Sequence, residues 1–366
     1  MGFFDRMLGK KTTLRRGNSE GTMYRADLSR TGFYPGTAPR TLRGVRWEVR
    51  CGDNFKSSPV TADGMVFVLP DDGVLHAIEA TTGKVKWKTP TGDRWGIGDS
   101  SPAVADGLVY VENSKFLYAI KVASGKVAWK FETTNGGSSS PAVCRDRVLF
   151  GCMDRVYAVD AATGKEAWHH DVKGLLKVPA VEADGGFVHW IANDVIISLD
   201  IDSGALVCRI ETPFESHRIV EPGIRQGRVL VGAREHSETL LVDARAGRAA
   251  SAGFGYLTSG FAIGPDRLFA TLESQLLAAW EASPDSKEFR RLWTLKDPFG
   301  GFYHTAPSAT SDTVLVGCDR GVCAVDAVSG VELWKHSTSS TVISPPAIDD
   351  GSVFVTTYGG VALALY

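Results

Sequence analysis

The stretch VYAVDAATGKEAW, from Val156 to Trp168, decides the fold of this chain. Its first residues are β-branched, aromatic or small, which predicts a strand. Residues 160–164 then have the composition of a tight turn and end in a Thr-Gly pair, where the glycine accommodates a positive φ. The last residues lead to a tryptophan, whose large ring needs a packing partner. Because a single hairpin is marginally stable in water, the chain must supply further strands.

The hairpin recurs along the chain, each time after a strand that opens with Pro or Ser-Pro. Every clear copy contains four strand-length runs that are separated by turns, and its glycine and tryptophan lie four residues apart, as Gly83 and Trp87 do. A recurring unit of this length predicts a repeat architecture. The clear copies cover residues 57–89, 100–131, 139–170 and 305–336.

Three further repeats depart from the pattern at the tryptophan or at the turn. Cys208 and Ser251 stand where the first two should have a tryptophan. The third replaces the tight turn by the longer EASPDSKEFRRLW and regains its ring at Trp293. These repeats cover residues 177–210, 220–253 and approximately 258–295.

The eighth repeat begins at Ser344 and ends after its third strand. The missing fourth strand is GVRWEVR, residues 44–50, because Trp47 aligns with the tryptophans of the other repeats. Sharing one repeat between the two chain ends closes a ring and leaves no uncapped sheet. We therefore predict an all-β fold: an eight-bladed β-propeller of four-stranded antiparallel blades, whose last blade is completed by the N-terminal strand.

The chain is expected to have one propeller domain at residues 42–366, in which residues 42–50 and 344–366 share the last blade. Residues 1–41 are expected to form a basic, irregular extension. Residues 1–16 combine apolar and basic side chains, which fits either a short amphipathic anchor for a membrane surface or partner groove, or a polar terminus. They do not have the order of charges of a secretory signal, and no run reaches the length of a membrane span. We therefore predict a cytoplasmic protein.

Composition excludes several classes of function. Lys and Arg number 40 against 42 acidic residues, so the chain does not have the basic excess of a nucleic-acid-binding protein. The six cysteines are never adjacent and mostly lie in apolar strand-like runs. This favours free, buried thiols over disulfides. Zinc is not expected, because the usual ligand spacing is missing.

The repeated pattern [Tyr/His]-Ala-[Ile/Val]-x-Ala-x-[Thr/Ser]-Gly-Lys-x-x-Trp resembles the PQQ-like repeat family. It occurs over residues 57–170 and again at 323–334, and MYRADLSRTGFYPG, residues 23–36, is similar to the lead-in segment of that family. The resemblance implies a propeller that is either a quinoprotein dehydrogenase or a scaffold of outer-membrane assembly, which binds no quinone. The scaffold and the other members without quinone are the better match.

The chain departs from the quinoprotein members of the family at the features that bind the cofactor. Those enzymes resemble it in blade motif but are longer and exported, and they carry a vicinal disulfide over the quinone and Glu, Asn and Asp ligands for calcium. Here no two cysteines are adjacent, and no matching ligand set is present. We therefore predict no PQQ, no metal and no catalytic residue carried over from the family, because a shared fold does not imply a shared function.

The candidate site lies on one face of the predicted ring. The connectors between each fourth strand and the next blade share this face with the turns between second and third strands, and we name it the connector face. Its aromatic and charged side chains favour a binding surface, although the rings also fit inward packing between loops. The candidate residues are Lys56, Arg94, Trp95, Asp99, Lys177, His217, Arg218, Tyr256, Phe302, Tyr303 and His304.

Two functions are compatible with this site. The favoured one is a non-catalytic scaffold or binding module, which takes a protein, a peptide or a small ligand on the connector face or in the central funnel. The alternative is a small-molecule lyase, hydrolase or isomerase in the funnel, with His217 or His304 as general base and Arg218 as anion clamp. Because the sequence shows no nucleophile–base pair, metal triad or phosphate loop, we favour the binding module.

Overall fold

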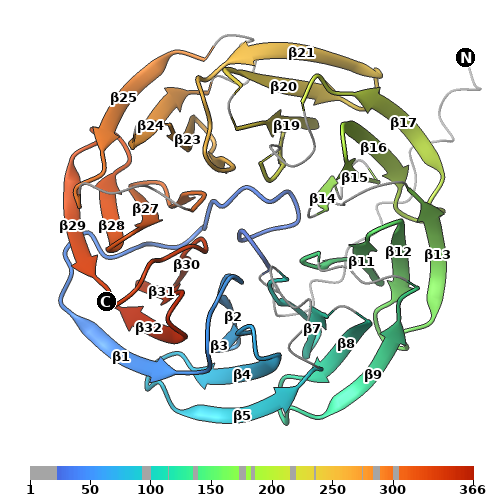
Figure 1. The fold of residues 1–366 in the computed structure, drawn as a ribbon, viewed down its shortest axis with the longest axis horizontal. Helices are drawn as coiled ribbons and strands as arrows, with labels where there is room; N and C mark the ends of the chain where they lie inside the picture. The colour runs from blue at the N-terminus through green and yellow to red at the C-terminus, as the bar shows by residue number, and fades with distance from the viewer. Residues whose placement is uncertain are drawn as a thin grey trace, which may run out of the picture.

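The computed structural model describes residues 23–92, 100–113, 115–134, 139–172, 179–182, 186–214, 220–234, 236–273, 275–282, 289–299 and 305–366. Over these residues, 32 strands form eight four-stranded antiparallel sheets around a central axis (Figure 1). The predicted eight-bladed propeller is confirmed. No helix in the described ranges has the length and apolar character needed to cross a membrane. The anchor or polar terminus expected at residues 1–16 lies outside them.

Each blade runs from a short inner strand to a long outer strand. Blades 1 to 4 consist of β2 (Val60–Ala62), β3 (Met65–Val68), β4 (Val74–Glu79), β5 (Val85–Pro90); β6 (Ala103–Ala105), β7 (Leu108–Glu112), β8 (Phe116–Lys121), β9 (Val127–Glu132); β10 (Ala142–Cys144), β11 (Arg147–Cys152), β12 (Arg155–Asp160), β13 (Glu166–Asp171); β14 (Ala180–Glu182), β15 (Phe187–Ala192), β16 (Val195–Asp200) and β17 (Leu206–Glu211).

The other four blades follow the same order. Blades 5 to 8 consist of β18 (Gly223–Arg225), β19 (Arg228–Gly232), β20 (Glu238–Asp243), β21 (Arg248–Gly253); β22 (Ala262–Ile263), β23 (Arg267–Leu272), β24 (Leu276–Glu281), β25 (Arg291–Lys296); β26 (Ser308–Ala309), β27 (Thr313–Cys318), β28 (Gly321–Asp326), β29 (Glu332–Ser337); β30 (Ala347–Asp349), β31 (Ser352–Thr356), β32 (Val361–Leu365) and β1 (Val45–Arg50).

Strand β1 closes the ring, as the sequence predicts. It pairs antiparallel with β32, with Trp47 opposite Ala364 and Arg50 opposite Val361. The first and last strands of the chain therefore belong to one sheet, and no blade is left without its outer strand.

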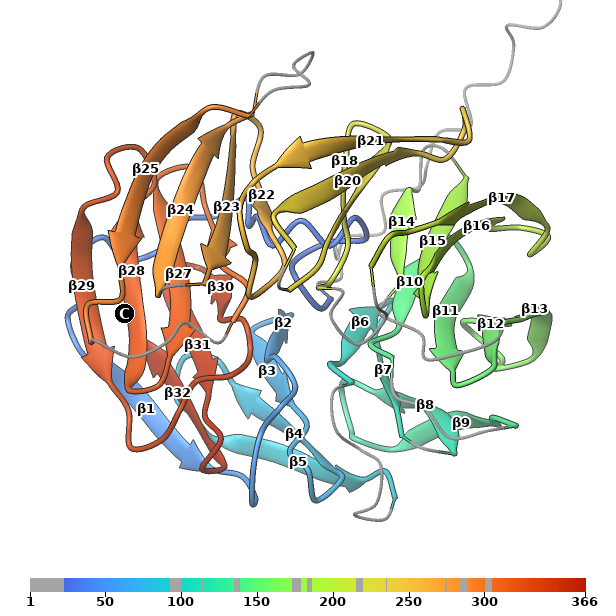
Figure 2. The same cartoon turned by 45° about the horizontal axis from the view of Figure 1, so that its top comes forward.

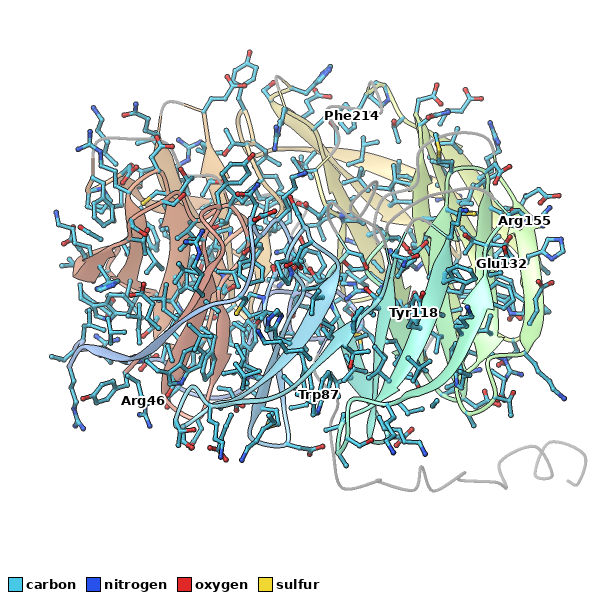
Figure 3. The ribbon with its side chains drawn as sticks, turned by 60° about the horizontal axis from the view of Figure 1, so that its bottom comes forward. Arg46, Trp87, Tyr118, Glu132, Arg155 and Phe214 are labelled. Atoms are coloured by element: carbon cyan, nitrogen blue, oxygen red, sulfur yellow. The ribbon has the colours of Figure 1, made fainter. Side chains whose placement is uncertain are left out.

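The hydrophobic core is divided among the interfaces between blades. Middle strands are buried on both faces, and β27 is buried along its whole length, whereas the outer β5 alternates between less and more exposed residues. Continuous apolar runs belong to strands covered on both sides, and alternation belongs to strands with one wet face. Trp87 and Tyr118, from neighbouring blades, pack against one such cluster (Figure 3).

The tryptophan of each regular blade packs on the next blade. Trp87 Nε1 donates a hydrogen bond of 2.7 Å to the carbonyl of Val122, and its ring covers Gly125, whose φ is +68°. An added Cβ at Gly125 would lie 2.7 Å from that ring, so only glycine fits. The same contact occurs at five seams, formed by Trp47 and Gly83, Trp87 and Gly125, Trp129 and Gly164, Trp168 and Gly204, and Trp293 and Gly330.

Residues 23–34, named the central segment, cross the middle of the ring among the inner strands (Figures 1 and 2). The inner strand of each blade is an edge strand, so its channel-facing N–H groups need acceptors. The central segment offers one carbonyl to each of four successive blades. Val181 N–H donates to Leu28 (2.8 Å), Ile224 N–H to Ser29 (2.8 Å), Ile263 N–H to Thr31 (2.7 Å) and Ala309 N–H to Gly32 (2.8 Å).

Arg30 extends the contacts of the central segment to blade 3. Its side chain is fully buried, and burial lowers its pKa to about 10, so it remains charged at neutral pH. Its guanidinium donates to four carbonyl oxygens, those of Tyr24 (2.7 Å), Pro179 (2.9 Å), Pro141 (3.0 Å) and Ser140 (3.1 Å). Because every nitrogen has an acceptor, this buried charge is satisfied.

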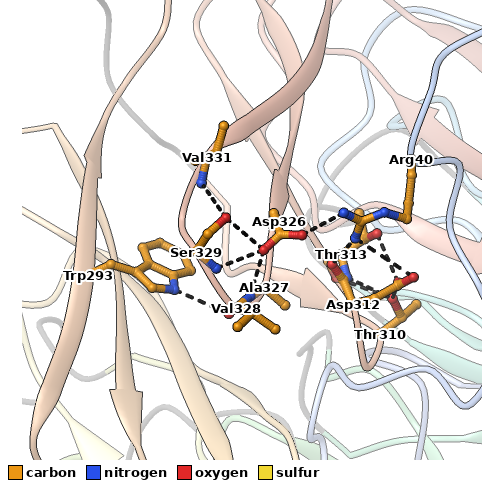
Figure 4. A network of polar contacts seen from close by, with 10 residues as sticks. All are labelled: Arg40, Trp293, Thr310, Asp312, Thr313, Asp326, Ala327, Val328, Ser329 and Val331. Carbon is orange, nitrogen blue, oxygen red and sulfur yellow. Dashed lines mark hydrogen bonds and ion pairs between the residues drawn. The ribbon is translucent and has the colours of Figure 1, made fainter.

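The chain leaves the centre between blades 7 and 8. The carbonyl of Pro39 accepts a 2.6 Å hydrogen bond from Trp334 Nε1, so this segment replaces the turn that blade 8 does not have. Next to it, Arg40 donates to Asp326 at 2.6 Å (Figure 4). This bond and the Ser329 backbone N–H hold the pKa of Asp326 well below its usual range. Pro39 therefore completes the seam between blades 7 and 8, and β1 completes the sheet of blade 8.

Candidate functional site

The connector face is built from strand connectors and turns that hydrogen-bond to each other. Cys51 N–H donates to Gly360 O at 2.9 Å, and Asp71 N–H donates to Asn54 O at 2.8 Å. Of the predicted site residues, Lys56 and Tyr256 lie in the described part of the chain. The other nine lie outside it and stay predictions: Arg94, Trp95, Asp99, Lys177, His217, Arg218, Phe302, Tyr303 and His304.

Lys56 lies just before β2, on the connector face of blade 1. Its side chain is exposed, and Nζ lies 3.7 Å from a carboxylate oxygen of Asp71 in the following turn. An exposed pair of this length contributes little to stability. Lys56 is therefore free to contact a ligand without a large cost to the fold.

Tyr256 lies on the connector between blades 5 and 6 and is 50% exposed. Its carbonyl accepts a 2.8 Å hydrogen bond from Glu273 N–H. The neighbouring Phe254 is fully buried, and its ring centroid lies 5.0 Å from that of Phe261 and 5.2 Å from that of Trp280. The connector is thus anchored by one buried ring and presents another to solvent. Lys56 and Tyr256 share the face but stand on distant blades, so they do not form one compact site.

Two exposed apolar side chains on the connector face were missed by the sequence reasoning. Tyr358 is 45% exposed in the turn between β31 and β32, and Met153 is exposed in the turn between β11 and β12. Tyr358 is held in place by its N–H, which donates to Thr341 O at 2.8 Å. The signal was present in the sequence, because large apolar residues are unusual in tight turns.

Glu112, at the end of β7, is a buried carboxyl group that joins blade 2 to blade 3. Its Oε2 accepts hydrogen bonds from Ser139 N–H at 2.8 Å and from Ser139 Oγ–H at 3.1 Å. Its Oε1 has no partner among the described residues. Burial raises the pKa of Glu112 to about 8, against the weaker opposing effect of the two Ser139 bonds. The carboxyl is therefore mostly protonated at neutral pH.

Replacing Glu112 by Gln is expected to stabilise the protein at alkaline pH. Because the pKa of Glu112 is higher in the folded than in the unfolded protein, its contribution to the free energy of unfolding is complete below the unfolded pKa of about 4.3. This contribution is lost as the pH rises through the folded pKa of about 8, by at most about 1.4 kcal/mol per pH unit. Glutamine keeps the acceptor for Ser139 and has no charge to lose. Thermal unfolding should therefore favour Glu112→Gln over the wild type by up to about 4 kcal/mol more at pH 8 than at pH 5.

The exposed Glu132 of the same blade provides the control for this experiment (Figure 3). Glu132→Gln should leave the melting temperature close to that of the wild type at both pH values. If the stability difference between Glu112→Gln and wild type is the same at pH 5 and pH 8, Glu112 ionises normally in the folded protein.

In the part of the chain that the structure describes, the cysteines and the other potential metal ligands do not cluster into a metal site. None of the six cysteines forms a disulfide, and burial raises the pKa of both Cys51 and Cys318 to about 12, so these thiols stay protonated. Within the described ranges, no three His, Cys, Asp or Glu side chains gather as metal ligands do.

Comparisons with known structures find the same fold at low identity. The quinohemoprotein alcohol dehydrogenase from Comamonas testosteroni is 14% identical, with a TM-score of 0.76 over 94% of this chain and 80% of that one. BamB from Moraxella catarrhalis is 15% identical, with a TM-score of 0.69 over 88% and 97%. The computationally designed Ika8 protein is 14% identical, with a TM-score of 0.75 over 88% and 99%. At such identities the likeness shows the fold alone.

Comparison with protein families is more specific. No curated protein sequence matches the chain. The family model described as outer membrane protein assembly factor BamB matches residues 43–150, 152–250 and 282–366, which together make up most of the chain. The match covers the blades with clear repeats and the eroded blades 4 and 5, leaves out residues 251–281 in blade 6, and confirms the resemblance to PQQ-like repeat propellers. The chain therefore belongs to the family of the outer membrane protein assembly factor BamB.

Proposed function

We propose that this chain is a non-catalytic scaffold that binds a protein partner on its connector face. The family that it belongs to is described as an assembly factor, and a solved structure named BamB shares its fold. Among the described residues, the exposed large aromatic side chains are Tyr256 and Tyr358, and both lie on this face. Exposed tyrosines are typical anchors of protein interfaces, because they bury a large rigid ring and keep a polar tip.

The observation that carries the proposal is the occupied centre of the ring. Small-molecule sites need a concave space into which polar groups converge. Here the central segment runs through the channel and hydrogen-bonds the inner strands of successive blades with its carbonyls and with Arg30. This arrangement favours a binding surface at the mouth of the channel rather than an active site inside the channel. We also propose that the protein works without PQQ, because the sequence has no adjacent cysteines and the described residues hold no cluster of metal ligands.

Partner capture tests the proposed surface. A Tyr256→Ser/Tyr358→Ser variant should retain less than a tenth of the partner that the wild type captures from the cytoplasmic fraction of the native host, because interface aromatic residues each contribute about 2 kcal/mol or more. Cross-linking with mass spectrometry should place the partner on the connector face. A second variant, with Trp95, Arg218 and Tyr303 each changed to Ala, tests the predicted residues that lie outside the described ranges.

The matched control removes exposed apolar side chains from the opposite face. Val328 and Val331 lie in the turn between β28 and β29 and are both exposed. Val328→Ser/Val331→Ser should capture as much partner as the wild type, and all variants should keep its melting temperature. If the tyrosine variant still captures the partner, or if only the valine variant fails, the connector face is not the binding surface.

A further inference from the structure

Blade 4 replaces a set of three apolar residues of the regular blades by polar ones. In the six blades that carry the tryptophan, this residue lies opposite an alanine of the third strand, and that alanine lies opposite a leucine or an aromatic residue of the second strand. In blade 4 the same three positions hold Cys208, Ser198 and His189. A thiol, a hydroxyl and an imidazole therefore stand together where the other blades have apolar packing.

These three side chains form a hydrogen-bonded chain that leads to Glu182 at the end of β14. Cys208 Sγ–H donates to Ser198 Oγ at 3.6 Å, and Ser198 Oγ lies 2.8 Å from His189 Nδ1. His189 Nε2 faces Glu182 Oε2 at 3.8 Å. Because the serine accepts from the thiol, its single proton is donated to Nδ1, and the imidazole proton lies on Nε2 toward the carboxylate. A nucleophile, a base and an orienting carboxylate in this order are typical of an activated nucleophile.

The contact between His189 and Glu182 is buried and incomplete. His189 is 1% exposed, and neither its Nε2 nor Glu182 Oε2 has a hydrogen-bond partner among the described residues. Glu182 Oε1 pairs with Arg245 of blade 5 at 2.8 Å, and His189 and Arg245 hold the pKa of Glu182 below its usual value. An ionised carboxylate beside a neutral imidazole stabilises the imidazolium that forms when the ring takes up a proton.

Cys208 is the member of this chain of groups that reaches solvent. Ser198 is fully buried, whereas Cys208 is partly exposed and the other five cysteines are buried. A tryptophan at the position of Cys208 would cover Gly247, as the rings of five other seams cover their turn glycines. An added Cβ on Gly247 would meet nothing within 4 Å, so the space of the missing ring is open and a small reagent can approach the thiol.

We propose that Cys208 is a site of reversible oxidation, at which the thiol reacts with a hydroperoxide. His189 takes up the thiol proton through Ser198, and Glu182 stabilises the resulting imidazolium. The thiolate attacks one oxygen of the hydroperoxide, and the S–O bond forms as the O–O bond breaks. The leaving oxygen takes the proton back from the imidazolium. The sulfur is thereby oxidised by two electrons to a sulfenic acid, and the hydroperoxide is reduced to an alcohol or, from hydrogen peroxide, to water.

Mass spectrometry of the purified full-length chain tests the proposal, which does not depend on the protein partner proposed above. The folded protein is treated with hydrogen peroxide at pH 7 in the presence of dimedone, which traps sulfenic acids. The peptide that contains Cys208 should be labelled at least about tenfold faster than the peptides of the five buried cysteines, because reactivity follows thiolate character and exposure. The buried cysteines also report whether the protein has stayed folded.

Two variants that restore residues of the regular blades test the roles of the hydroxyl and the imidazole. Ser198→Ala and His189→Phe each introduce a residue that other blades carry at the same position, so the fold should tolerate both. Each should slow the labelling of Cys208 at least about tenfold. Val207→Ala is the matched control, because it changes an exposed neighbour of Cys208 on β17 and should be labelled as fast as the wild type.

The pH profile separates activation of the thiol from mere exposure. The charged side chains beside His189 line one pocket of about 370 Å³ between blades 4 and 5, and they are Glu182, Arg228, Asp243 and Arg245. The thiolate fraction of an ordinary thiol falls about 20-fold between pH 8 and pH 6.5. Alkylation of Cys208 by iodoacetamide should fall less than about fivefold over this range in the wild type, and about 20-fold in Ser198→Ala.

Two results would overturn the proposal. The first is labelling of Cys208 that is as slow as that of the buried cysteines. The second is the same rate and the same pH profile in the wild type and in Ser198→Ala, which would mean that the thiol reacts through its exposure alone. Should His189→Phe fail to fold, Ser198→Ala decides between these outcomes, because it removes one buried hydroxyl and leaves His189 and Glu182 in place.

Discussion

Replacing Arg30 by Met is expected to destabilise the propeller by about 3–5 kcal/mol, the largest effect of any single change that we predict. The side chain is fully buried, and its guanidinium is the donor to four carbonyl oxygens of the central segment and of blades 3 and 4. Methionine has similar length but no donor, so these acceptors lose the bond and stay away from water. Each unsatisfied buried carbonyl costs about 1–3 kcal/mol.

Urea denaturation followed by tryptophan fluorescence measures this loss of stability. Two further variants test whether it comes from the buried guanidinium. Arg30→Lys keeps the charge without the planar fork, so its stability should lie between those of wild type and Arg30→Met. Arg40 lies beyond the central segment, where the chain reaches the surface, and it pairs with Asp326. Arg40→Met should therefore change the midpoint little. An Arg30→Met protein within 1 kcal/mol of the wild type would contradict the view that the central segment is part of the core.

The blades follow from local sequence, which explains why the architecture could be predicted. A turn such as residues 160–164 needs only neighbouring residues to form, and the glycine–tryptophan spacing marks the same point in each repeat. The register of β12 on β13 follows from which side chains must be buried. The closing strand β1 was identified because the last repeat lacked one strand and Trp47 matched the tryptophans of the other repeats.

The path of the central segment could not be predicted in the same way. Its residues have no periodic pattern, and its bonds to blades 4 to 7 include one from a backbone carbonyl to each blade, a group that every residue carries. In the sequence, Arg25 and Arg30 look like ordinary surface charges, since arginines are seldom fully buried. On the connector face, Tyr256 was predicted from its aromatic connector, whereas Tyr358 is the only aromatic residue of a short turn within a blade, so no neighbouring ring marked it as part of a site.

Replacing Gly164 by Ala is expected to cost about 2–5 kcal/mol. Two effects add at this residue. Its φ is +70°, a conformation that costs an L side chain about 1–2 kcal/mol. The added Cβ would also lie 2.5 Å from the ring of Trp129, so the ring must move away from the seam, and overpacking of this kind costs about 1–3 kcal/mol. Urea denaturation of the variant measures the sum.

Gly247 separates the two effects, because it holds the same turn position in blade 5 with φ +60° and nothing within 4 Å of an added Cβ. The preceding blade carries Cys208 where the others carry a tryptophan, so no ring covers this glycine. Gly247→Ala should therefore lose only the backbone term, about 1–2 kcal/mol, and the difference from Gly164→Ala measures the ring contact. Equal losses in the two variants would mean that the tryptophans do not lock the seams, and that the blades without them are held as firmly as the rest.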